Sequence, residues 1–341
     1  MILNPDSKCR IIVDAMGGDY APENAVKGAF LALKEDPSIE LFFTGDKIKI
    51  KEVLVRFNLE FDNKFIIHTS ETIEMGDSPT SSLKSKPDSS IVVGAKKVKD
   101  GEAHAFVSAG NTGAMMAAST LIMGRLEGVG RPTIGATFPA ATGQCTVFDV
   151  GASVDSKPKH LLEYALMGSI FVEEIYGIEN PKVGLLSVGE EESKGNQTTI
   201  AAFDLLKNSN LNFLGNVEGR DILNGKVDLV VCDGYTGNIL LKFGESMLNL
   251  LKVKMKDYSE VSLWNKIKIL LSKGTLKDVL KGFDYQRFGG VPLLGVNGIS
   301  IIGHGSSSVL AMKNMVLRAK EMYDKDILHK LEQSIKVYNE K

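Results

Sequence analysis

Seven side chains that can bind an anion or move a proton stand in Gly-rich turns, each following an apolar stretch of this 341-residue sequence. They are Asp14, Asn111, Lys194, Asn196, Asp233, Asn238 and His304. Amide and ammonium N–H groups suit an oxyanion or a phosphate, whereas carboxylate and imidazole groups suit proton transfer or the ordering of donors. A helix N-cap is the competing interpretation of each acid. The residue types therefore predict an anion-binding site with a proton-handling group.

Residues 106–123 show this pattern most fully. An apolar run ends at Ser108, a turn continues through Gly110 to Thr112 and Gly113, and small or apolar residues then recur at helical spacing. A strand, a tight turn and a helix start place several unpaired N–H groups and the positive end of a helix dipole together. Such an arrangement binds anions. A single turn of this kind is equally typical of a strand–helix connection that binds no ligand. The repetition of the pattern along the chain therefore favours an anion-binding site.

The elements that must position these turns alternate along the chain. We expect apolar strands at residues 10–13, 41–44, 65–68, 106–108, 132–138, 146–151, 182–187, 227–232 and 299–302, mostly followed by helices. This alternation predicts an α/β fold of three α/β/α layers with a mainly parallel sheet. Ligands bind beyond the carboxyl ends of the strands in such sheets. The Gly/Asn/Ser turns all lie at those ends, so we expect them to form one cleft.

The remaining candidate phosphate ligands come from the same turns. They are Gly17, Gly18, Ser108, Gly110, Thr112, Gly113, Gly305, Ser306 and Ser307, beside Asp14 and Asn196. A further segment, residues 74–90, is rich in hydroxyl groups and lysines. Its composition is that of a linker, or of a loop that closes over an anion.

Composition excludes several functional classes. A net charge of −2 argues against a nucleic-acid binder, and the apolar share of 43% is that of an ordinary globular protein. The N-terminal residues lack the features of a signal peptide, and no apolar run approaches a membrane span. Three cysteines without paired spacing fit a reducing cytosol, and no residues show metal-ligand spacing. The P-loop, the dinucleotide-binding glycine pattern and the serine hydrolase elbow are also absent.

The turns together resemble those of the bacterial phosphate acyltransferases, the acyl-acyl carrier protein:phosphate transacylases of fatty acid and phospholipid synthesis. The motifs that carry the resemblance lie at residues 14–22, 108–113, 189–196, 215–221, 232–238 and 304–307. The similarity runs from about Arg10 to Leu317. It departs from the family pattern at Ser153, where Asn is usual, and at Lys84, where Arg is usual. Lys84 keeps the charge of arginine but not its bidentate fork.

This resemblance implies that phosphate attacks the thioester of a long-chain acyl-acyl carrier protein and gives acyl phosphate for phosphatidic acid and phospholipid synthesis. It also implies a homodimer and a fold like that of isopropylmalate dehydrogenase and phosphotransacetylase. The location it implies is cytoplasmic, with peripheral contact with the inner face of the cell membrane and with the downstream glycerol-3-phosphate acyltransferase. The reaction needs no metal or cofactor, because phosphate is already a nucleophile.

Within that reaction we expect Lys194, Asn111 and Asn238 to bind phosphate and the developing oxyanion. Backbone N–H groups of the glycine turns would assist them. Either His304 or Asp233 would protonate the leaving thiolate or order the phosphate, and the sequence does not choose between them.

A basic segment interrupts the strand–helix alternation. Eight lysines and three acids lie between Lys252 and Lys281, interleaved with apolar residues. We therefore interpret residues 1–341 as one α/β catalytic unit with residues 245–285 as an amphipathic helical hairpin insertion. The hairpin either packs on the sheet or on a second subunit, or docks on anionic lipid or the acidic carrier protein. The candidate docking residues are Val261, Leu263, Trp264, Lys266, Ile267 and Lys268.

Two other functions compete with the acyltransferase. A dehydrogenase of the isopropylmalate type would share the fold but would need a metal-binding acid cluster and a nucleotide loop, which the sequence does not show. A non-catalytic protein that binds acyl carrier protein would not need Asn, Lys and Asp at the strand ends.

Overall fold

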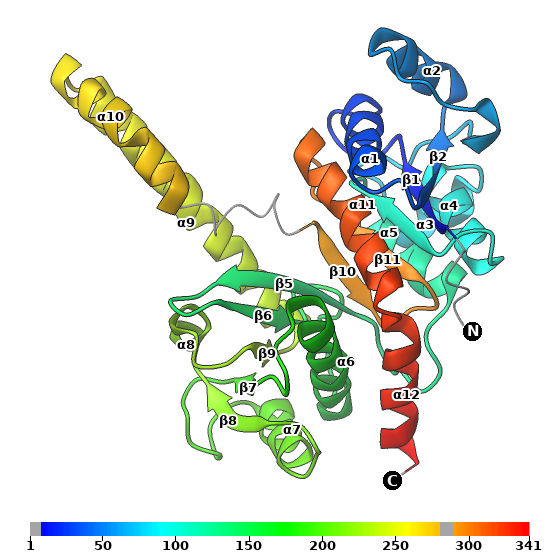
Figure 1. The fold of residues 1–341 in the computed structure, drawn as a ribbon. Coiled ribbons are helices and arrows are strands. Elements are labelled where there is room, and N and C mark those ends of the chain that lie inside the picture. The colour runs from blue at the N-terminus through cyan, green and yellow to red at the C-terminus, as the bar shows by residue number, and fades with distance from the viewer. Residues whose placement is uncertain (1–7, 280–288, 341) are drawn as a thin grey trace.

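The computed structural model describes residues 8–279 and 289–340, and in them one eleven-stranded sheet is covered by helices on both faces (Figure 1). The strands are β1 (Cys9–Asp14), β2 (Ile39–Gly45), β3 (Ile66–His68), β4 (Ala105–Ser108), β5 (Thr133–Pro139), β6 (Gln144–Phe148), β7 (Val183–Leu186), β8 (Phe213–Val217), β9 (Leu229–Val231), β10 (Val291–Leu294) and β11 (Ile299–Ile302). The α-helices are α1 (Glu23–Glu35), α2 (Lys47–Arg56), α3 (Pro79–Ser85), α4 (Ser90–Lys99), α5 (Thr112–Ala118), α6 (Pro158–Tyr176), α7 (Gln197–Lys207), α8 (Gly219–Asn224), α9 (Gly234–Glu260), α10 (Leu263–Val279), α11 (Val309–Asp324) and α12 (Ile327–Asn339). Two short helical turns, η1 (Asn63–Phe65) and η2 (Ser119–Met123), complete the assignment.

The buried apolar residues form two clusters, one on each face of the sheet. Helices α1, α6, α7, α11 and α12 contribute to one cluster, and α4 and α5 contribute to the other. Within β1, Ile11 and Val13 belong to the first cluster and Ile12 to the second. A strand buried on both faces reads as a continuous apolar run, which is why these strands were visible in the sequence. The predicted three-layer α/β/α fold is confirmed.

The sheet runs in the order β3-β2-β1-β4-β11-β10-β5-β6-β9-β7-β8. Its outer pairs are parallel on both sides. Three antiparallel pairs lie at the centre, β11 with β10, β10 with β5, and β5 with β6. An odd number of reversals means that the two halves of the sheet run in opposite directions. The carboxyl ends of their strands therefore do not share one edge, as a wholly parallel sheet would require.

The sheet forks between β5 and β10. Only Leu293 with Ile134 and Leu294 with Thr133 pair across these strands, although β5 continues to Pro139. Pro292 is the first β10 residue beyond the paired region, and proline has no N–H to offer a neighbouring strand. The two halves of the sheet consequently separate here, and the strand ends of each half face the gap.

Side-chain caps start the helices that follow the strands. Asn111, Asn196, Asp233 and Ser308 accept hydrogen bonds from the first-turn N–H groups of α5, α7, α9 and α11. Such caps satisfy donors that a helix start leaves unpaired. The Asn, Asp and Ser residues of the turns therefore have a structural role, whatever else they bind.

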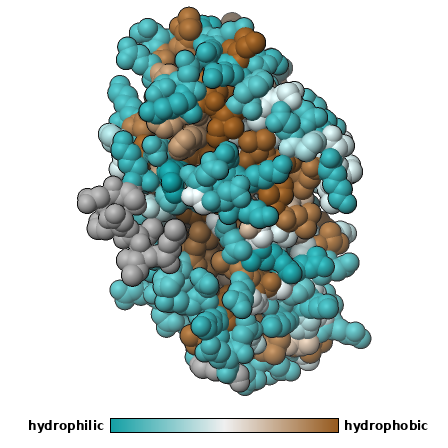
Figure 2. All heavy atoms as spheres, turned by 90° about the vertical axis from the view of Figure 1, so that its right-hand side faces the viewer, coloured by the Kyte–Doolittle hydropathy of each residue, from teal (hydrophilic) through white to brown (hydrophobic). Residues whose placement is uncertain are grey.

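Helices α9 and α10 form a long hairpin that projects away from the sheet (Figure 1). The two helices join at residues 261–262, and the helix pair begins earlier than the predicted residue 245. Residues 280–285 of the predicted hairpin lie outside the described residues. Large apolar side chains are exposed along it, including Phe243, Leu263 and Trp264. Hydrophobic residues also gather along the middle of the face that Figure 2 shows, so exposed apolar surface is not restricted to the hairpin.

Candidate active site

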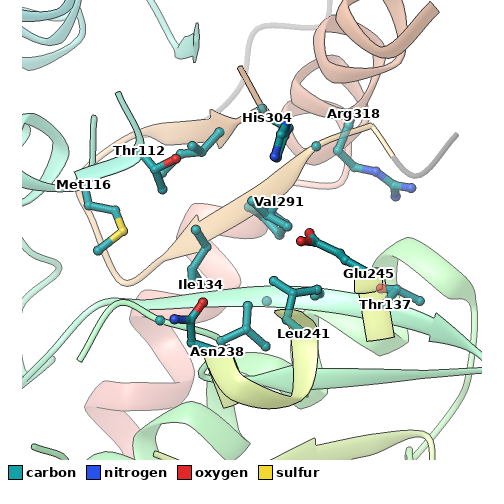
Figure 3. Close-up of a pocket in the computed structure, with 18 of the residues that line it drawn as sticks. Thr112, Met116, Ile134, Thr137, Asn238, Leu241, Glu245, Val291, His304 and Arg318 are labelled. Carbon is teal, nitrogen blue, oxygen red and sulfur yellow. The ribbon is translucent and has the colours of Figure 1, made fainter. Parts of the chain in front are cut away.

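A pocket of about 370 Å³ occupies the fork between β5 and β10 (Figure 3). Its volume is within the range of small-molecule sites. Val291 and His304 line it from one half of the sheet, and Ile134 and Leu241 line it from the other. Figure 3 shows Val291, Ile134 and Leu241 around its middle. The pocket therefore lies between the two halves of the molecule, and apolar side chains surround its middle, where Figure 3 also shows the Glu245 side chain.

Polar groups from both halves of the sheet meet at one end of this pocket. Thr112 lies at the start of α5 and Asn238 in the first turns of α9, and Figure 3 shows them on opposite sides of the same end. Gly151, in the turn after β6, also lines the pocket. Three of the predicted residues, Thr112, Asn238 and His304, thus come together although they are far apart in the sequence. We call the part lined by Thr112, Asn238 and Gly151 the polar end.

Two glycines set the position of Asn238. A Cβ at Gly237 would lie 1.9 Å from the carbonyl oxygen of Asp149, and a Cβ at Gly234 would lie 2.5 Å from the carboxylate of Asp149. Because neither glycine has a side chain, the start of α9 packs directly on the turn after β6. A Cβ at Gly151 would be 3.6 Å from the Asn238 side chain. This close packing holds the Asn238 amide beside the Gly151 backbone.

Asp149 organises this turn, and the sequence analysis did not select it. Its buried carboxylate accepts hydrogen bonds from the N–H groups of Ile134, Gly151, Ala152 and Ser153, at 3.1, 3.2, 3.0 and 2.8 Å. Burial raises the pKa of Asp149, and these four donors oppose that effect. The available signal was an aspartate followed by Gly at the end of an apolar strand, the same pattern as at Asp14 and Asp233.

Asp14, Ser108 and the first glycine turns form a buried cluster that supports the strand ends. The Ser108 hydroxyl donates to the Asp14 carboxylate at 2.7 Å, and the Gly110 N–H donates to the Ser108 hydroxyl at 3.0 Å. A Cβ at Gly17 would lie 2.6 Å from both Asp14 and the Gly110 nitrogen, so only glycine fits there. Burial raises the pKa of Asp14. These residues hold β1 against β4, and the structure gives Asp14 and Ser108 partners inside the protein.

The Asn111 side chain is engaged inside the protein in the same way. Its Oδ1 accepts from the Ala114 N–H at 3.0 Å, and its Nδ2 donates to the carbonyl groups of Glu74, Met75 and Asp77 at 3.0, 3.2 and 3.1 Å. Both ends of the buried amide are therefore used. These bonds support a role for Asn111 in positioning the segment that contains residues 74–77, and a phosphate contact for its amide stays a prediction.

That segment is not a linker. Lys86 bonds the Thr72 carbonyl at 2.8 Å and the Asp77 carboxylate at 2.5 Å, and α3 follows the segment's first turn. A Cβ at Gly113 would lie 2.5 Å from Pro79, so the glycine lets α3 pack on the start of α5. Lys84 is in the last turn of α3. Residues 74–90 are therefore folded against the turn that follows β4, and closure of this segment over an anion stays a prediction.

Lys194, Asn196 and Asp233 lie on the same side of the second half-sheet, outside the pocket lining. Asn196 caps α7 by accepting from the Thr199 N–H at 2.9 Å. Asp233 caps α9, accepting from the N–H and hydroxyl of Thr236 at 2.9 and 2.7 Å. Both side chains are thus helix N-caps, which the competing interpretation of the acids predicted for Asp233. The two oxygens of Asp233 hold the helix start, and its proton-transfer role stays a prediction.

Lys194 is the exposed cation of the loop after β7. The neighbouring acids bond other lysines, since Glu190 pairs with Lys226 at 2.7 Å and Glu192 pairs with Lys207 at 2.8 Å. No carboxylate lies within salt-bridge distance of the Lys194 ammonium in the part of the chain that the structure describes. Strand β7 runs parallel to β9 and is its direct neighbour. The loop therefore leaves from the same edge as the turn that carries Asn238.

His304 begins the turn between β11 and α11. The Ser306 N–H donates to the Nδ1 atom of His304 at 3.2 Å, and the Ser306 hydroxyl is 2.8 Å from the same atom. A ring nitrogen that accepts from a backbone N–H carries no proton, so the neutral ring has its proton on Nε2. Ser307 is buried and donates to the His304 carbonyl at 2.6 Å. Gly305 accepts from the Asp19 N–H at 2.8 Å, which ties the turn to the one containing Gly18.

Comparison with known structures places the fold. A phosphotransacetylase from Streptococcus pyogenes superposes with a TM-score of 0.59, at 18% identity, over 96% of this chain and 94% of that chain. At this identity the likeness shows the fold alone. The molecule thus has the phosphotransacetylase type of α/β fold, as the resemblance of its turns implies.

Sequence comparison gives the family. A family model described as "Fatty acid synthesis protein" matches residues 9–330. A phosphate acyltransferase of Halothermothrix orenii is 46% identical over 96% of this chain and 98% of its own length. One of Endomicrobium trichonymphae is 45% identical over 97% and 99%, respectively. The chain belongs to the fatty acid synthesis protein family, and the resemblance of its turns is confirmed.

Two features are absent from residues 8–279 and 289–340. No group of three or more His, Cys, Asp and Glu side chains in these ranges is arranged to hold a metal ion. None of the helices in them has the length and apolar character needed to cross a bilayer.

Proposed function

We propose that this protein is a phosphate acyltransferase that moves a long-chain acyl group from acyl-acyl carrier protein to inorganic phosphate and releases acyl phosphate. The observation that carries the proposal is the pocket at the fork, where apolar side chains such as Ile134 and Val291 adjoin a polar end lined by Thr112, Asn238 and Gly151. An acyl phosphate has the same division into an apolar chain and an anionic group. The similarity to curated phosphate acyltransferases supports the same reaction.

The reaction joins a phosphate oxygen to the thioester carbonyl carbon and breaks the carbon–sulfur bond. Phosphate supplies the electron pair, and the thiolate of the carrier protein leaves with the electrons of the broken bond. The protein must hold the two reactants in contact and stabilise the negative charge that develops on the carbonyl oxygen. The amide of Asn238 and the helix start beside it supply donors for that charge, and Lys194 supplies a cation for the phosphate.

His304 lines the pocket from the half of the sheet that faces Asn238, and we assign it the role of a hydrogen-bond donor. Its Nδ1 accepts from Ser306, so its Nε2–H donates. A neutral imidazole donor stabilises charge on phosphate or on the carbonyl oxygen without surrendering its proton. A thiolate leaves more readily than an alkoxide because its conjugate acid has a pKa near 8.5. We therefore assign His304 to charge stabilisation and not to obligatory acid catalysis.

The cysteines do not suit a covalent acyl intermediate. Cys232 lies at the end of β9 near the polar end, where a nucleophile would be expected. Its thiol is buried and directed at the Asp149 carbonyl, 3.4 Å away, and burial raises its pKa well above the ordinary value. Thiols react as thiolates. Direct attack by phosphate is the mechanism that these residues favour.

The two competing functions are not favoured. An isopropylmalate-type dehydrogenase would require an acid cluster for a metal, and none gathers in the described ranges. A non-catalytic carrier-protein binder would have no use for a pocket with polar groups from both halves of the sheet.

We also propose that the α9–α10 hairpin brings the enzyme to its partners. The exposed side chains of Val261, Leu263, Trp264 and Ile267 surround the turn between the helices, with Lys266 and Lys268 beside them. Apolar groups flanked by lysines suit an anionic membrane face, and the lysines also suit the acidic carrier protein. The exposed apolar residues closer to the sheet, such as Phe243 and Leu250, suit a second copy of the chain. In this proposal the chain is a single catalytic unit, acts at the inner membrane face as a homodimer, and passes acyl phosphate to a glycerol-3-phosphate acyltransferase.

The assay for the proposed reaction is release of free thiol from palmitoyl-acyl carrier protein while phosphate is varied. Thiol release should require phosphate and should persist in the presence of a metal chelator. Thiol release that needs a nicotinamide cofactor, or that proceeds equally well without phosphate, would reject the proposed function.

A further inference from the structure

We propose that the acyl chain runs through the fork from the polar end and stops at Tyr176, which fixes the chain length that the enzyme accepts. This inference rests on the proposed function. It concerns the end of the pocket opposite to Asn238, where Thr137, Arg318 and Tyr176 line the cavity. Figure 3 shows Thr137 and Arg318 at the opposite end of the pocket from Thr112 and Asn238.

Three contacts hold the Tyr176 ring in place. Its hydroxyl lies 2.8 Å from the hydroxyl of Thr137 on β5. The guanidinium of Arg318 on α11 lies over the ring at 5.5 Å from its centre, and the ring of Phe171 meets it edge-on at 5.7 Å. Burial raises the pKa of the Tyr176 phenol, so it stays a neutral hydrogen-bonding group. A ring fixed from three sides forms a wall that does not move aside at low cost.

The interior between the two ends suits a hydrocarbon chain. Ile134, Ala136, Val150, Leu241 and Val291 line it, and the two charged residues that line it from α9, Lys242 and Glu245, pair with each other at 2.9 Å. Each methylene removed from water favours binding by about fourfold, so the pocket gains affinity with each carbon until the chain meets the wall. Beyond that length, an added methylene must displace the aromatic ring or remain outside the pocket.

The polar end is the reactive end in this proposal because the Asn238 amide and the starts of α5 and α9 offer hydrogen-bond donors there. A thioester carbonyl beside Asn238 and Gly151 directs its hydrocarbon tail past Ile134 and Val291 toward Tyr176. The same placement leaves the sulfur, and the carrier protein attached to it, on the solvent side of the exposed residues Thr112 and Asn238. In this one orientation the acyl tail lies in the pocket, the phosphate lies at the polar end and the carrier protein stays in solvent.

The test compares two pocket variants with one control. Tyr176→Ala removes the wall, and Tyr176→Leu does so with less loss of packing in case the alanine variant folds poorly. Val291→Phe narrows the middle of the pocket from the other half of the sheet. Tyr338→Ala is the matched control, because Tyr338 is a half-buried tyrosine that packs on the core at α12 and does not line this pocket.

The measurement is kcat/KM for myristoyl-, palmitoyl- and stearoyl-acyl carrier protein at saturating phosphate. Both Tyr176 variants should raise the stearoyl-to-myristoyl ratio by about tenfold or more, since each additional buried methylene contributes up to about fourfold. Val291→Phe should lower the same ratio, and Tyr338→Ala should leave it unchanged. Unchanged ratios in active Tyr176 and Val291 variants would overturn this inference while leaving the proposed function intact. No phosphate-dependent turnover by the unmodified protein with any of the three substrates would reject the proposed function itself.

Discussion

Replacement of Asn111 by alanine separates a positioning role from a phosphate-binding role. In the structure, Asn111 caps α5 and binds three carbonyl groups of the segment at residues 74–77. If this is its role, Asn111→Ala should lower the free energy of unfolding and loosen that segment. If the amide instead binds phosphate, the same change should raise the KM for phosphate and leave stability nearly unchanged.

The expected loss of stability follows from these contacts. Loss of a helix cap costs about 1 kcal/mol. The Nδ2 group has two hydrogens to share among three carbonyl groups, and each hydrogen bond contributes a net of about 1 kcal/mol. The residues of this segment are largely exposed, so the freed carbonyls regain water and no larger burial penalty applies. The sum is about 3 kcal/mol, or a fall of about 1 M in the urea midpoint if the m-value is about 3 kcal/mol/M.

Asn196→Ala is the matched control because Asn196 also caps a helix, α7, but is exposed and has only Thr199 as a hydrogen-bond partner among the described residues. It should cost about 1 kcal/mol. Urea unfolding of both variants gives the difference, and hydrogen exchange of residues 74–77 should be faster in Asn111→Ala alone. Equal stability losses in the two variants, with normal exchange in this segment, would refute the positioning role.

Three further predictions address catalysis, pH dependence and docking. Lys194→Ala and Asn238→Ala should each lower kcat/KM by about a hundredfold, because both side chains would stabilise transition-state charge. Both side chains are exposed, so the urea midpoint should change little. Near-normal turnover by either variant would exclude that residue from the mechanism. Burial raises the pKa of the Glu163 carboxyl, so this carboxyl binds its proton more tightly in the folded protein than in the unfolded chain. The contribution of Glu163 to the free energy of unfolding therefore decreases as the pH rises above the unfolded pKa of about 4.3. As the pH rises from about 4.5 to 7, the Glu163→Gln variant should lose less stability in urea unfolding than the unmodified protein, and parallel curves of stability against pH would contradict this. Joint replacement of Lys266 and Lys268 by glutamate should weaken binding to anionic vesicles by about tenfold or more, since each lysine near such a surface contributes about 1 kcal/mol; equal sedimentation with both proteins would exclude lipid docking through these lysines.

The sequence was sufficient for the layers of the fold and for most strand–turn–helix units. Strands buried on both faces read as apolar runs, as at Ile11, Ile12 and Val13, and cap residues mark the helix starts. The reversal of the sheet at β10, β5 and β6 could not be predicted, because an apolar run does not reveal the direction of its neighbours. For that reason the sequence predicted one shared edge, whereas the structure brings strand ends together from two halves across the fork.

The sequence predicted which turns form the candidate site, but it could not predict what each side chain in those turns does. An asparagine or aspartate at a helix start has the same sequence pattern whether it binds a ligand or caps the helix. Asn111, Asn196 and Asp233 cap helices, whereas Asn238, inside the first turns of α9, faces the pocket. Tyr176 gave no signal, since it lies at the end of a helix and reaches the pocket only through packing between α6 and β5.

The most direct test of the central proposal is to trap the product with hydroxylamine. Acyl phosphates react with hydroxylamine to give acyl hydroxamates, so palmitoyl-acyl carrier protein and phosphate should yield palmitoyl hydroxamate and free carrier-protein thiol in equal amounts. Omission of phosphate should abolish both products beyond the background of an enzyme-free sample. Thiol release without hydroxamate, or equal hydroxamate in the presence and absence of phosphate, would contradict acyl transfer to phosphate.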